Sequence, residues 1–375
     1  MKIVILGLSV TSSWGNGHAT TYRSLILGLY GRGHDIRFLE REAPWYAGNR
    51  DEPNPSGART DIYHSLDELV RRYEQIVSDA DLVIVGSFVP DGVAVGEWVT
   101  SVATGVTAFY DIDTPITIEK IRLAAAGNEG ACEYLTPSLI RSYDMYLSFT
   151  GGPLLKEIES GFGSPEARPL FCSVDPRKYF PVQREERWAM GYLGTYSEDR
   201  QPALESLMVG PARQLPSRAF AVAGPMYPES IDWPENVTRI IHLSPREHPG
   251  FYCEQRFTLN ITRDAMKRAG YSPSVRLFEA GACGAPVISD WWHGLDTIFV
   301  PGKEVLLADS PEDVLRCLHD LTGDSAAGIG RAMRQRILNE HTSDKRAAQL
   351  EHYFEKAAER TGKKRAPASL RTVSA

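Results

Sequence analysis

The sequence has few cysteines, and they show no arrangement typical of a metal site. Its five cysteines are odd in number and far apart, without a Cys-x-x-Cys pair or the regular spacing of metal ligands. Five free thiols in a reducing cytoplasm are the simplest interpretation. We therefore expect a cytoplasmic protein with no bound metal.

Long apolar runs and long basic runs are also missing. No stretch approaches about 18 uninterrupted apolar residues, so we expect no membrane span. The apolar run that begins after Lys2 ends at Gly7, which is too short for a signal sequence and favours a buried first strand. The net charge of −7 is modest, and no long basic run precedes the last residues, so we expect no nucleic-acid partner. Any phosphate site must be local.

Size and composition indicate two globular domains. A chain of 375 residues is too long for one ordinary core and suits two domains. Its hydrophobic share of 42% and charged share of 24% are typical of proteins that bury a core.

The first half of the sequence predicts one α/β open sheet over residues 1–172. Short apolar runs alternate with helical or loop material, as they do in buried parallel strands. A Gly/Ser/Thr-rich loop and a helix follow the first strand, and Ser65 with Glu68 predicts a capping box at the start of another helix. The expected strands are 3–6, 36–39, 82–85, 106–110 and 145–149.

The second half predicts a similar domain. A charged, Pro-containing stretch over 173–187 is predicted to be a linker, 188–342 a second α/β domain, 343–361 a helix and 362–375 a disordered tail. The expected strands are 190–194, 219–223, 239–243, 257–260, 286–289 and 304–307. Two open α/β sheets in tandem can place the carboxyl ends of their strands along a shared cleft.

Two loops of the first domain carry candidate functional residues. Gly15, Gly17 and His18 lie between a strand and a helix, where backbone amides can approach a phosphate. The loop is an incomplete G-x-G-x-x-G, and a tight turn with a capping His explains it as well. Asp111 and Asp113 follow a buried strand and are candidate acids or bases, although Asp113 is equally a candidate helix cap.

The second domain has a denser cluster of candidates. Gly194 ends a strand, and Arg200 begins the next helix, a position that suits a diphosphate contact or a surface ion pair. Ser274 is predicted to cap a helix that carries Arg276 and Glu279 among small residues. A carboxylate there can bind two ribose hydroxyls or can simply be a solvated helix residue.

The stretch Phe278–Ser289 resembles the glutamate-containing motif of group 1 glycosyltransferases. The longer block 260–304 resembles their CgeB-like (spore-maturation protein) branch, and Val174–Pro181 is similar to the segment that crosses between domains in these enzymes. The resemblance implies a GT-B fold, which has two Rossmann-like open-sheet domains facing a cleft, with a C-terminal helix that can cross back to the N-terminal domain.

The resemblance also implies a function. We expect a glycosyltransferase that moves a sugar from a nucleotide-diphosphate-sugar donor to an unidentified acceptor, with retention and with neither a metal nor a separate cofactor. Glu279 would bind the donor ribose, Arg200 a phosphate, and Gly15 or Gly17 would lie beside the diphosphate. If the enzyme inverts configuration, Asp113, Asp111 and His18 are candidate bases. The predicted donor-binding residues are Gly15, Gly17, Gly194, Arg200, Asn260, Arg263, Ser274, Arg276 and Glu279, and the predicted catalytic residues are Asp113 and His18.

One departure from the group 1 pattern keeps alternatives open. Tyr271 stands where these enzymes often have a second glutamate, and the candidates to replace it are Asn260, Arg263, Arg276 or the loop 290–296. A nucleotide-sugar epimerase and a non-catalytic nucleotide-sugar-binding protein therefore remain alternatives. An NAD dehydrogenase is the weakest one, because the dinucleotide fingerprint is incomplete.

Overall fold

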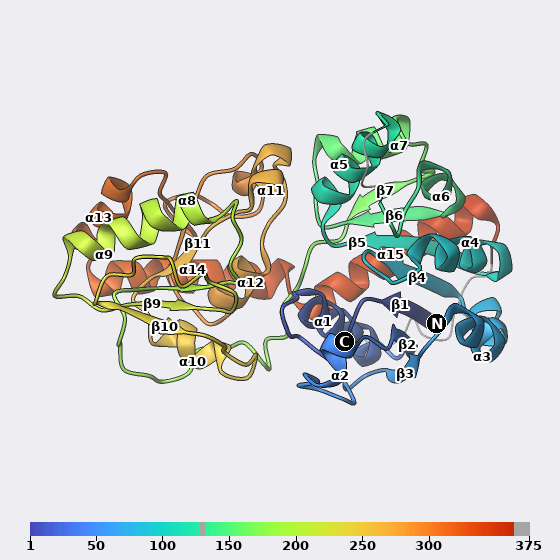
Figure 1. Cartoon of the computed structure of the whole chain (residues 1–375), viewed down its shortest axis with the longest axis horizontal. Helices are drawn as coiled ribbons and strands as arrows, with labels where there is room; N and C mark the ends of the chain where they lie inside the picture. Colours follow the sequence, from blue (N-terminus) through green and yellow to red (C-terminus); the bar gives the residue numbers. More distant parts are fainter. Residues whose placement is uncertain (128–131, 364–375) are drawn as a thin grey trace. The chain divides into compact units, whose positions relative to one another are not determined.

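The structure is a computed structural model that describes residues 1–127 and 132–363. It divides into two compact units (Figure 1). The first contains Met1–Phe171 and the chain from Ser343 onward, and the second is Cys172–Thr342. The segment 173–187, which the sequence predicts to be a linker, is thus counted with the second unit. The predicted disordered tail lies, from residue 364, outside the described residues.

The first unit is a parallel seven-stranded sheet with helices on its faces. In sheet order its strands are β3 (Arg59–Tyr63), β2 (Asp35–Arg41), β1 (Lys2–Gly7), β4 (Leu82–Gly86), β5 (Val106–Asp111), β6 (Met145–Ser148) and β7 (Ala167–Pro169). Its helices are α1 (His18–Gly31), α2 (Pro44–Ala47), α3 (Leu66–Ser78), α4 (Gly92–Val102), α5 (Thr114–Ala125), α6 (Pro137–Ser142), α7 (Pro153–Ser160) and α15 (Ser343–Thr361).

The second unit is a parallel six-stranded sheet. In sheet order its strands are β10 (Val237–Ile240), β9 (Phe220–Ala223), β8 (Met190–Leu193), β11 (Thr258–Asn260), β12 (Val287–Ser289) and β13 (Leu306–Leu307). Its α-helices are α8 (Gln201–Leu204), α9 (Gly210–Gln214), α10 (His248–Cys253), α11 (Asp264–Ala269), α12 (Val275–Ala282), α13 (Pro311–Asp320) and α14 (Gly323–Glu340). A short π-helix (Glu205–Val209) joins α8 to α9.

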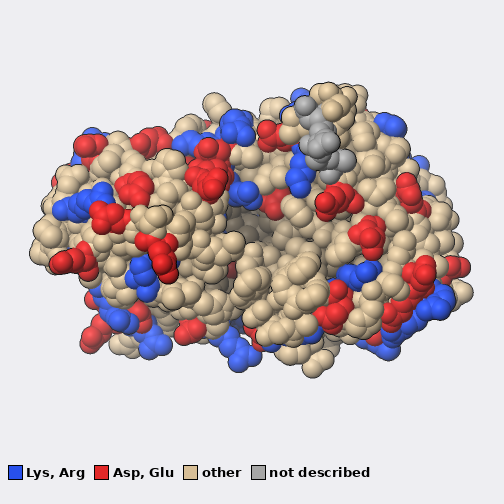
Figure 2. Space-filling view, in the orientation of Figure 1, with Lys and Arg blue, Asp and Glu red and all other residues tan. Residues whose placement is uncertain are grey.

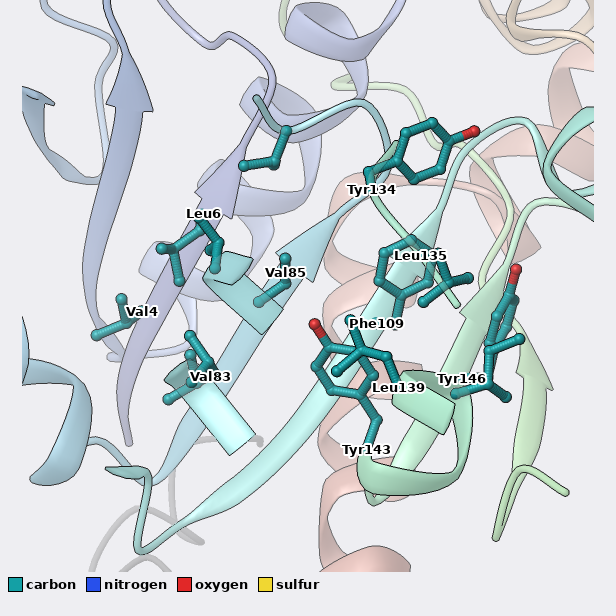
Figure 3. Packing of buried hydrophobic residues seen from close by; sticks show 14 of the residues in the cluster. Val4, Leu6, Val83, Val85, Phe109, Tyr134, Leu135, Leu139, Tyr143 and Tyr146 are labelled. Carbon is teal, nitrogen blue, oxygen red and sulfur yellow. The ribbon is translucent and has the colours of Figure 1, made fainter. Parts of the chain in front are cut away.

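The central strands are apolar because helices cover both faces of the sheet. All five residues of β4 are buried, and Val83 and Val85 lie in the core shown in Figure 3. Phe109 of β5 and Tyr146 of β6 continue this core toward the sheet edge, with their rings 5.4 Å apart. Because all strands of this sheet are parallel, the loops that follow their carboxyl ends lie at one edge.

The C-terminal helix α15 packs on α1 within the first unit. At the contact, Arg32 and His34 both donate to the carboxylate of Glu351, with His34 Nε2 2.6 Å from Oε1. The GT-B architecture expected from the resemblance includes such a return of the C-terminal helix to the N-terminal domain.

Several local predictions need correction. Two strands were missed, because β3 is polar and only one of its five residues is buried, and because β7 has just three residues. Strand β10 begins at Val237 rather than at residue 239. The capping box is incomplete, since Ser65 accepts from the amide of Glu68 but the Glu68 carboxylate accepts from His64 instead of from Ser65.

The surface carries charges of both signs. Figure 2 shows Lys and Arg side chains interspersed with Asp and Glu on the face drawn, over both units. None of the described helices is long and apolar enough to cross a membrane.

Candidate functional site

In each sheet the strand order reverses between two neighbouring strands. Candidate residues lie beside these switch points. In the first unit the strand order runs outward from β1 on one side and from β4 on the other, and in the second unit it does so from β8 and β11. Ligands of open α/β sheets bind outside the carboxyl ends of the strands at such a switch point. Gly194 follows β8, and Asn260 ends β11.

In the second unit, Asn260 and Arg276 meet at the switch point. Asn260 Oδ1 accepts from Arg276 Nη1 at 2.8 Å and from Ser274 Oγ at 2.6 Å. The Arg276 Nε donates to the carbonyl of Leu193 at 2.6 Å. Because both acceptors of Arg276 are neutral, these contacts leave the charge of its buried guanidinium uncompensated.

Gly194 makes room for Arg276. A Cβ atom at residue 194 would lie 2.8 Å from Arg276 Nη2 and 2.7 Å from the Tyr192 hydroxyl. The guanidinium carbon of Arg276 lies 4.5 Å from the centre of the Tyr192 ring, which adds a cation–π contact. The end of β8 thus needs a residue without a side chain.

Ser274 does not cap its helix as predicted. It occupies the N-cap position of α12, but its side chain makes no capping hydrogen bond and binds Asn260 instead. Its hydroxyl therefore helps to orient the amide that holds Arg276.

Glu279 is a buried carboxylate, one turn after Arg276 on α12. Only 5% of Glu279 is exposed, which excludes the alternative of a solvated helix residue. Its Oε2 accepts from the Tyr252 hydroxyl at 3.2 Å and lies 3.5 Å from His248 Nδ1. Burial, followed by the charge of Glu279, raises the pKa of Tyr252 and of Tyr179 well above the usual value, so both stay protonated donors.

The sequence analysis missed His248, Tyr252 and Tyr179. They come from α10 and from the segment before β8. Tyr179 lies within the stretch Val174–Pro181, whose resemblance assigned it no role, and His248 and Tyr252 belong to no recognisable motif. Only the fold brings them to Glu279.

Arg200 and Arg263 lie on the segments that follow β8 and β11. Arg200 Nη2 donates to the carbonyl of Thr195 at 2.6 Å, and its buried Nε has no hydrogen-bond partner among the described residues. An ion pair joins Arg263 Nε to Asp199 Oδ2 at 3.7 Å. An unsatisfied buried guanidinium N–H is a candidate ligand donor.

An aromatic pair that the sequence analysis missed also borders Gly194. Tyr227 donates to the Gly194 carbonyl at 3.1 Å, and Arg239 lies 4.0 Å from the Tyr227 ring and 4.7 Å from the Trp233 ring. A Cβ atom at Gly224 would lie 2.1 Å from the Gly194 carbonyl oxygen. The loops after β8 and β9 therefore touch through their glycines.

Tyr271, which stands in place of the expected glutamate, has a packing role. Its backbone is left-handed at φ 49°, its amide donates to the His293 carbonyl at 2.5 Å, and its ring leaves no room for a Cβ at Gly294. The neighbouring Trp292 is 1% exposed and belongs to the core. Of the proposed replacements for a carboxylate, Asp290 is buried and accepts from Thr262 at 2.8 Å.

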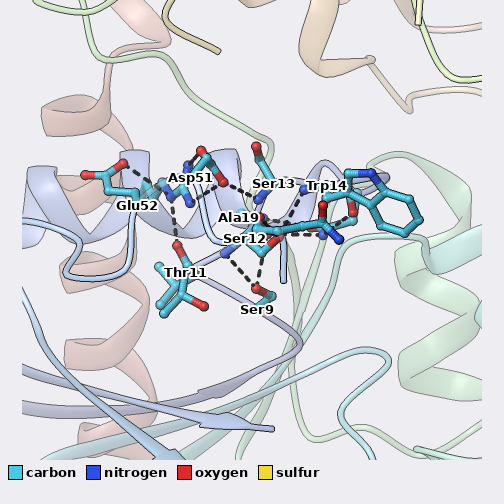
Figure 4. A network of polar contacts seen from close by, with 12 residues as sticks. Ser9, Thr11, Ser12, Ser13, Trp14, Ala19, Asp51 and Glu52 are labelled. Carbon is cyan, nitrogen blue, oxygen red and sulfur yellow. Dashed lines mark hydrogen bonds and ion pairs between the residues drawn. The ribbon is translucent and has the colours of Figure 1, made fainter. Parts of the chain in front are cut away.

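In the first unit, hydrogen bonds to Glu40 fix the start of the loop that carries Gly15 and Gly17. The fully buried Glu40 carboxylate accepts from the amides of Val10 and Thr11 at 2.6 Å and 3.0 Å and from the Thr11 hydroxyl at 2.6 Å. Further contacts of this network, such as Ser13 to Asp51, are drawn in Figure 4.

Gly15 has a clear reason to be glycine. Its φ of 66° is left-handed, and a Cβ there would meet nothing within 4 Å, so the requirement comes from the backbone and not from crowding. Gly17 has neither a positive φ nor a close neighbour. The fixed loop therefore exposes its tip beside His18.

His18 and Asp113 meet beside this loop. His18 Nε2 lies 3.8 Å from Asp113 Oδ2, and the buried Nδ1 of His18 has no hydrogen-bond partner among the described residues. Asp113 precedes α5 but makes no side-chain capping bond, so the alternative of a helix cap is not what the structure shows.

Asp111 is part of the core and contacts the backbone of Asp113. It is fully buried, accepts from the Tyr146 hydroxyl and from Thr117 Oγ1 at 2.9 Å, and accepts from the Asp113 amide at 3.2 Å. Burial raises the pKa of Asp111 to about 6. Among the described residues, no group of three or more His, Cys, Asp and Glu is placed to hold a metal ion.

Comparison with known proteins relates the region that carries this site to one protein family. Residues 200–352 match a family model described as glycosyl transferase-like, and this region contains Arg200, Arg276 and Glu279. No curated protein sequence matches the chain. The match does not identify the narrower CgeB-like branch, which stays a prediction.

Solved structures share the fold of this chain. Sucrose-phosphate synthase from Thermosynechococcus elongatus superposes with a TM-score of 0.68 at 14% identity, over 96% of this chain and 100% of that chain. HepE from Anabaena, in complex with UDP and glucose, gives 0.68 at 12% identity over 95% and 100%. An alpha-glucosyltransferase in complex with UDP-glucose and DNA containing an abasic site gives 0.69 at 13% identity over 95% and 99%.

The fold is therefore GT-B, with two Rossmann-like units. Together with the family match over residues 200–352, this fold supports an enzyme of the glycosyltransferase class.

Proposed function

We propose that this protein is a glycosyltransferase that takes its sugar from a nucleoside-diphosphate-sugar donor, which binds at the carboxyl edge of the second sheet. The observation that carries the proposal is the placement of Arg276 and Glu279 on successive turns of α12, both buried, at the switch point beside β8. Proteins with the same fold have been solved with UDP or UDP-glucose.

The arrangement supplies the two kinds of contact that such a donor needs. Arg276 and the buried Nε of Arg200 offer positive charge and N–H donors to a diphosphate, whose charge grows as the sugar departs. Glu279 offers a carboxylate to ribose hydroxyls, held in place by Tyr252 and His248.

We propose further that the transfer retains configuration and does not depend on a metal. Retention rests on the resemblance of Phe278–Ser289 to the group 1 motif. Independence from metal rests on the guanidinium groups of Arg200 and Arg276, which can themselves stabilise the departing diphosphate. The acceptor stays unidentified, and we propose that it binds at the His18 and Asp113 side of the first unit. A cytoplasmic location and the absence of a nucleic-acid partner stay predictions.

Nucleotide binding is the first test. Calorimetry and thermal shift with UDP, GDP, dTDP and their common sugar conjugates should identify one nucleotide that stabilises the protein, by about 2.7 kcal/mol at 100 times its Kd. Glu279→Ala should bind that nucleotide much more weakly. Glu304→Gln is the matched control, because Glu304 is also buried in the second unit but pairs with Arg336. Binding by none of the nucleotides would contradict the proposal.

Turnover separates this function from a second candidate, a nucleotide-sugar-binding protein without activity. Tyr271 favours that candidate, because it replaces a carboxylate with a packed ring. We expect slow hydrolysis of the matching nucleotide sugar, unchanged by EDTA, with an α- or β-product that NMR assigns relative to the donor. Tight binding without release of sugar, in the presence of a broad acceptor library, would favour the second candidate.

A further inference from the structure

Two of the five cysteines meet at the ends of the helices that hold Glu279. Cys253 is the last residue of α10, and Cys283 is the C-cap of α12. The Cys253 thiol donates to the carbonyl oxygen of Cys283 at 3.7 Å. The two residues are therefore neighbours within the second unit.

The two thiols differ in exposure and in reactivity. Cys253 is half-buried, whereas only 3% of Cys283 is exposed. The hydrogen bond from the Cys283 thiol, with that from the Val182 amide at 3.3 Å, lowers the pKa of Cys253 to about 7 despite its partial burial. The same contact and burial raise the pKa of Cys283. Cys253 is thus the more acidic and more nucleophilic thiol near neutral pH, and Cys283 keeps its proton.

We propose that Cys253 and Cys283 form a reversible disulfide on exposure to a peroxide, and that this bond weakens nucleotide binding at Glu279. The Cys253 thiolate attacks one peroxide oxygen, the O–O bond breaks, and a sulfenic acid and hydroxide form, which a solvent proton converts to water. Cys283 then attacks the sulfenic sulfur, the S–O bond breaks, and a second water leaves with the Cys283 proton. The two thiols lose two electrons, and hydrogen peroxide gains them. A dithiol reductant reverses the reaction by thiol–disulfide exchange.

The link from this pair to Glu279 is short on both helices. Cys253 directly follows Tyr252, whose hydroxyl binds Glu279 Oε2. The amide of Cys283 donates to the carbonyl of Glu279 at 3.2 Å. Because a disulfide brings two sulfurs from contact to about 2.05 Å apart, α10 and α12 must shift at the residues that orient the Glu279 carboxylate. The effect on nucleotide binding rests on the proposed function, whereas the formation of the disulfide does not.

The other cysteines provide a control. Cys317 is also half-buried, but it lies on α13, and burial raises its pKa instead of lowering it. It should be the slower thiol.

The experiment treats the full-length protein with stoichiometric hydrogen peroxide at neutral pH. Denaturing alkylation and mass spectrometry then count free thiols and map the disulfide. We expect a loss of two of the five thiols, a cross-linked peptide pair containing Cys253 and Cys283, and full recovery with dithiothreitol. Cys253→Ser should prevent the loss of both thiols, and Cys317→Ser should leave it unchanged. Cys283→Ala is the second variant, in which Cys253 should stop at the sulfenic acid, trapped by dimedone.

Calorimetry on the oxidised and reduced protein tests whether the disulfide weakens nucleotide binding. We expect nucleotide affinity to fall about tenfold on oxidation, which corresponds to about 1.4 kcal/mol, and to return on reduction, while Cys253→Ser binds equally before and after peroxide. No disulfide between these residues, or a disulfide that leaves affinity unchanged, would overturn the proposal. If the reduced protein binds no nucleotide, the proposed function fails, and the peptide map still decides whether the oxidation site exists.

Discussion

A Cβ atom on Gly28 of α1 would lie 2.1 Å from the carbonyl oxygen of Ser343, the first residue of α15. This approach lets the C-terminal helix lie directly on α1. Because the obstacle is backbone and not a flexible side chain, Gly28→Ala must push α15 away. We expect a loss of about 1–3 kcal/mol in the free energy of unfolding, measured by urea denaturation.

Gly31 on the same helix is the control for Gly28. A Cβ at Gly31 meets nothing within 4 Å. Gly31→Ala should therefore stabilise the protein slightly, by about 0.5–1 kcal/mol, because alanine is the better helix former. Equal effects of the two substitutions would show that the α1–α15 contact is not as close as described.

The same helix contact should make stability depend on pH through Glu351. Burial alone would raise the pKa of Glu351, but hydrogen bonds from His34 and Arg32 lower it from 4.5 to about 2. A carboxyl group with a lowered pKa in the folded state stabilises the fold above its unfolded pKa, and this stabilisation is lost as the pH falls from about 4.5 through about 2.

Glu351→Gln tests this dependence. It should cost about 1–3 kcal/mol at pH 7, because charge-assisted hydrogen bonds are lost. The difference between the wild type and the variant should shrink as the pH falls toward 2, in denaturation series at matched salt. A difference that stays constant across this range would refute the role of the ionised carboxylate.

Asp111 should give the opposite pH dependence. Burial raises the pKa of Asp111 from 3.8 to about 6, so the folded state binds its proton more tightly than the unfolded state. Stability from this group is present below about pH 3.8 and is lost as the pH rises through about 6. Asp111→Asn should remove this loss, so the variant should gain stability relative to the wild type between pH 4 and pH 6. A pH-independent difference in unfolding free energy would mean that Asp111 does not titrate there.

Much of the architecture was predictable because its physical signals are local. Buried parallel strands need continuous apolar runs, and Leu82–Val85 and Val106–Tyr110 have them. The polar strand β3 has no such run, since it is held at the sheet edge by pairing with β2 and is mostly half-buried. Pairing of this kind is a tertiary fact that no window of residues contains.

The candidate site was predictable only in part, for the same reason. Glu279 and Arg276 come from a single helix with a recognisable motif, so the sequence brought them forward together. Tyr252 and His248 reach Glu279 from α10, and Glu40 reaches the first loop from β2. A pattern search cannot find such partners, because they contact the site across the fold while carrying no motif of their own.

Variants of Asp113 should distinguish retention from inversion. If the enzyme retains configuration as proposed, Asp113→Asn should lower kcat by less than about tenfold, since no strong base is needed. A general base would contribute about 10²–10⁴-fold. Single-turnover rates and the anomeric configuration of the product, by NMR, are the measurements. A loss of about 10²–10⁴-fold, together with an inverted product, would identify Asp113 and His18 as the residues that act as the general base.

The contact between Arg276 and the end of β8 should be the most sensitive point of the donor site. Arg276 uses Nε for the Leu193 carbonyl and Nη1 for Asn260, and a lysine amine cannot hold both while it faces a phosphate. Arg276→Lys should therefore weaken nucleotide binding by about 10–100-fold, which corresponds to about 1.4–2.8 kcal/mol. Gly194→Ala should do the same, because its Cβ would lie 2.8 Å from Nη2. Gly323→Ala, at a position with open space, is the matched control.

Calorimetry with the nucleotide identified in the first screen gives each Kd, and circular dichroism confirms folding. If both variants bind as the wild type does while Glu279→Ala does not, the diphosphate is held elsewhere, with Arg200 the next residue to test.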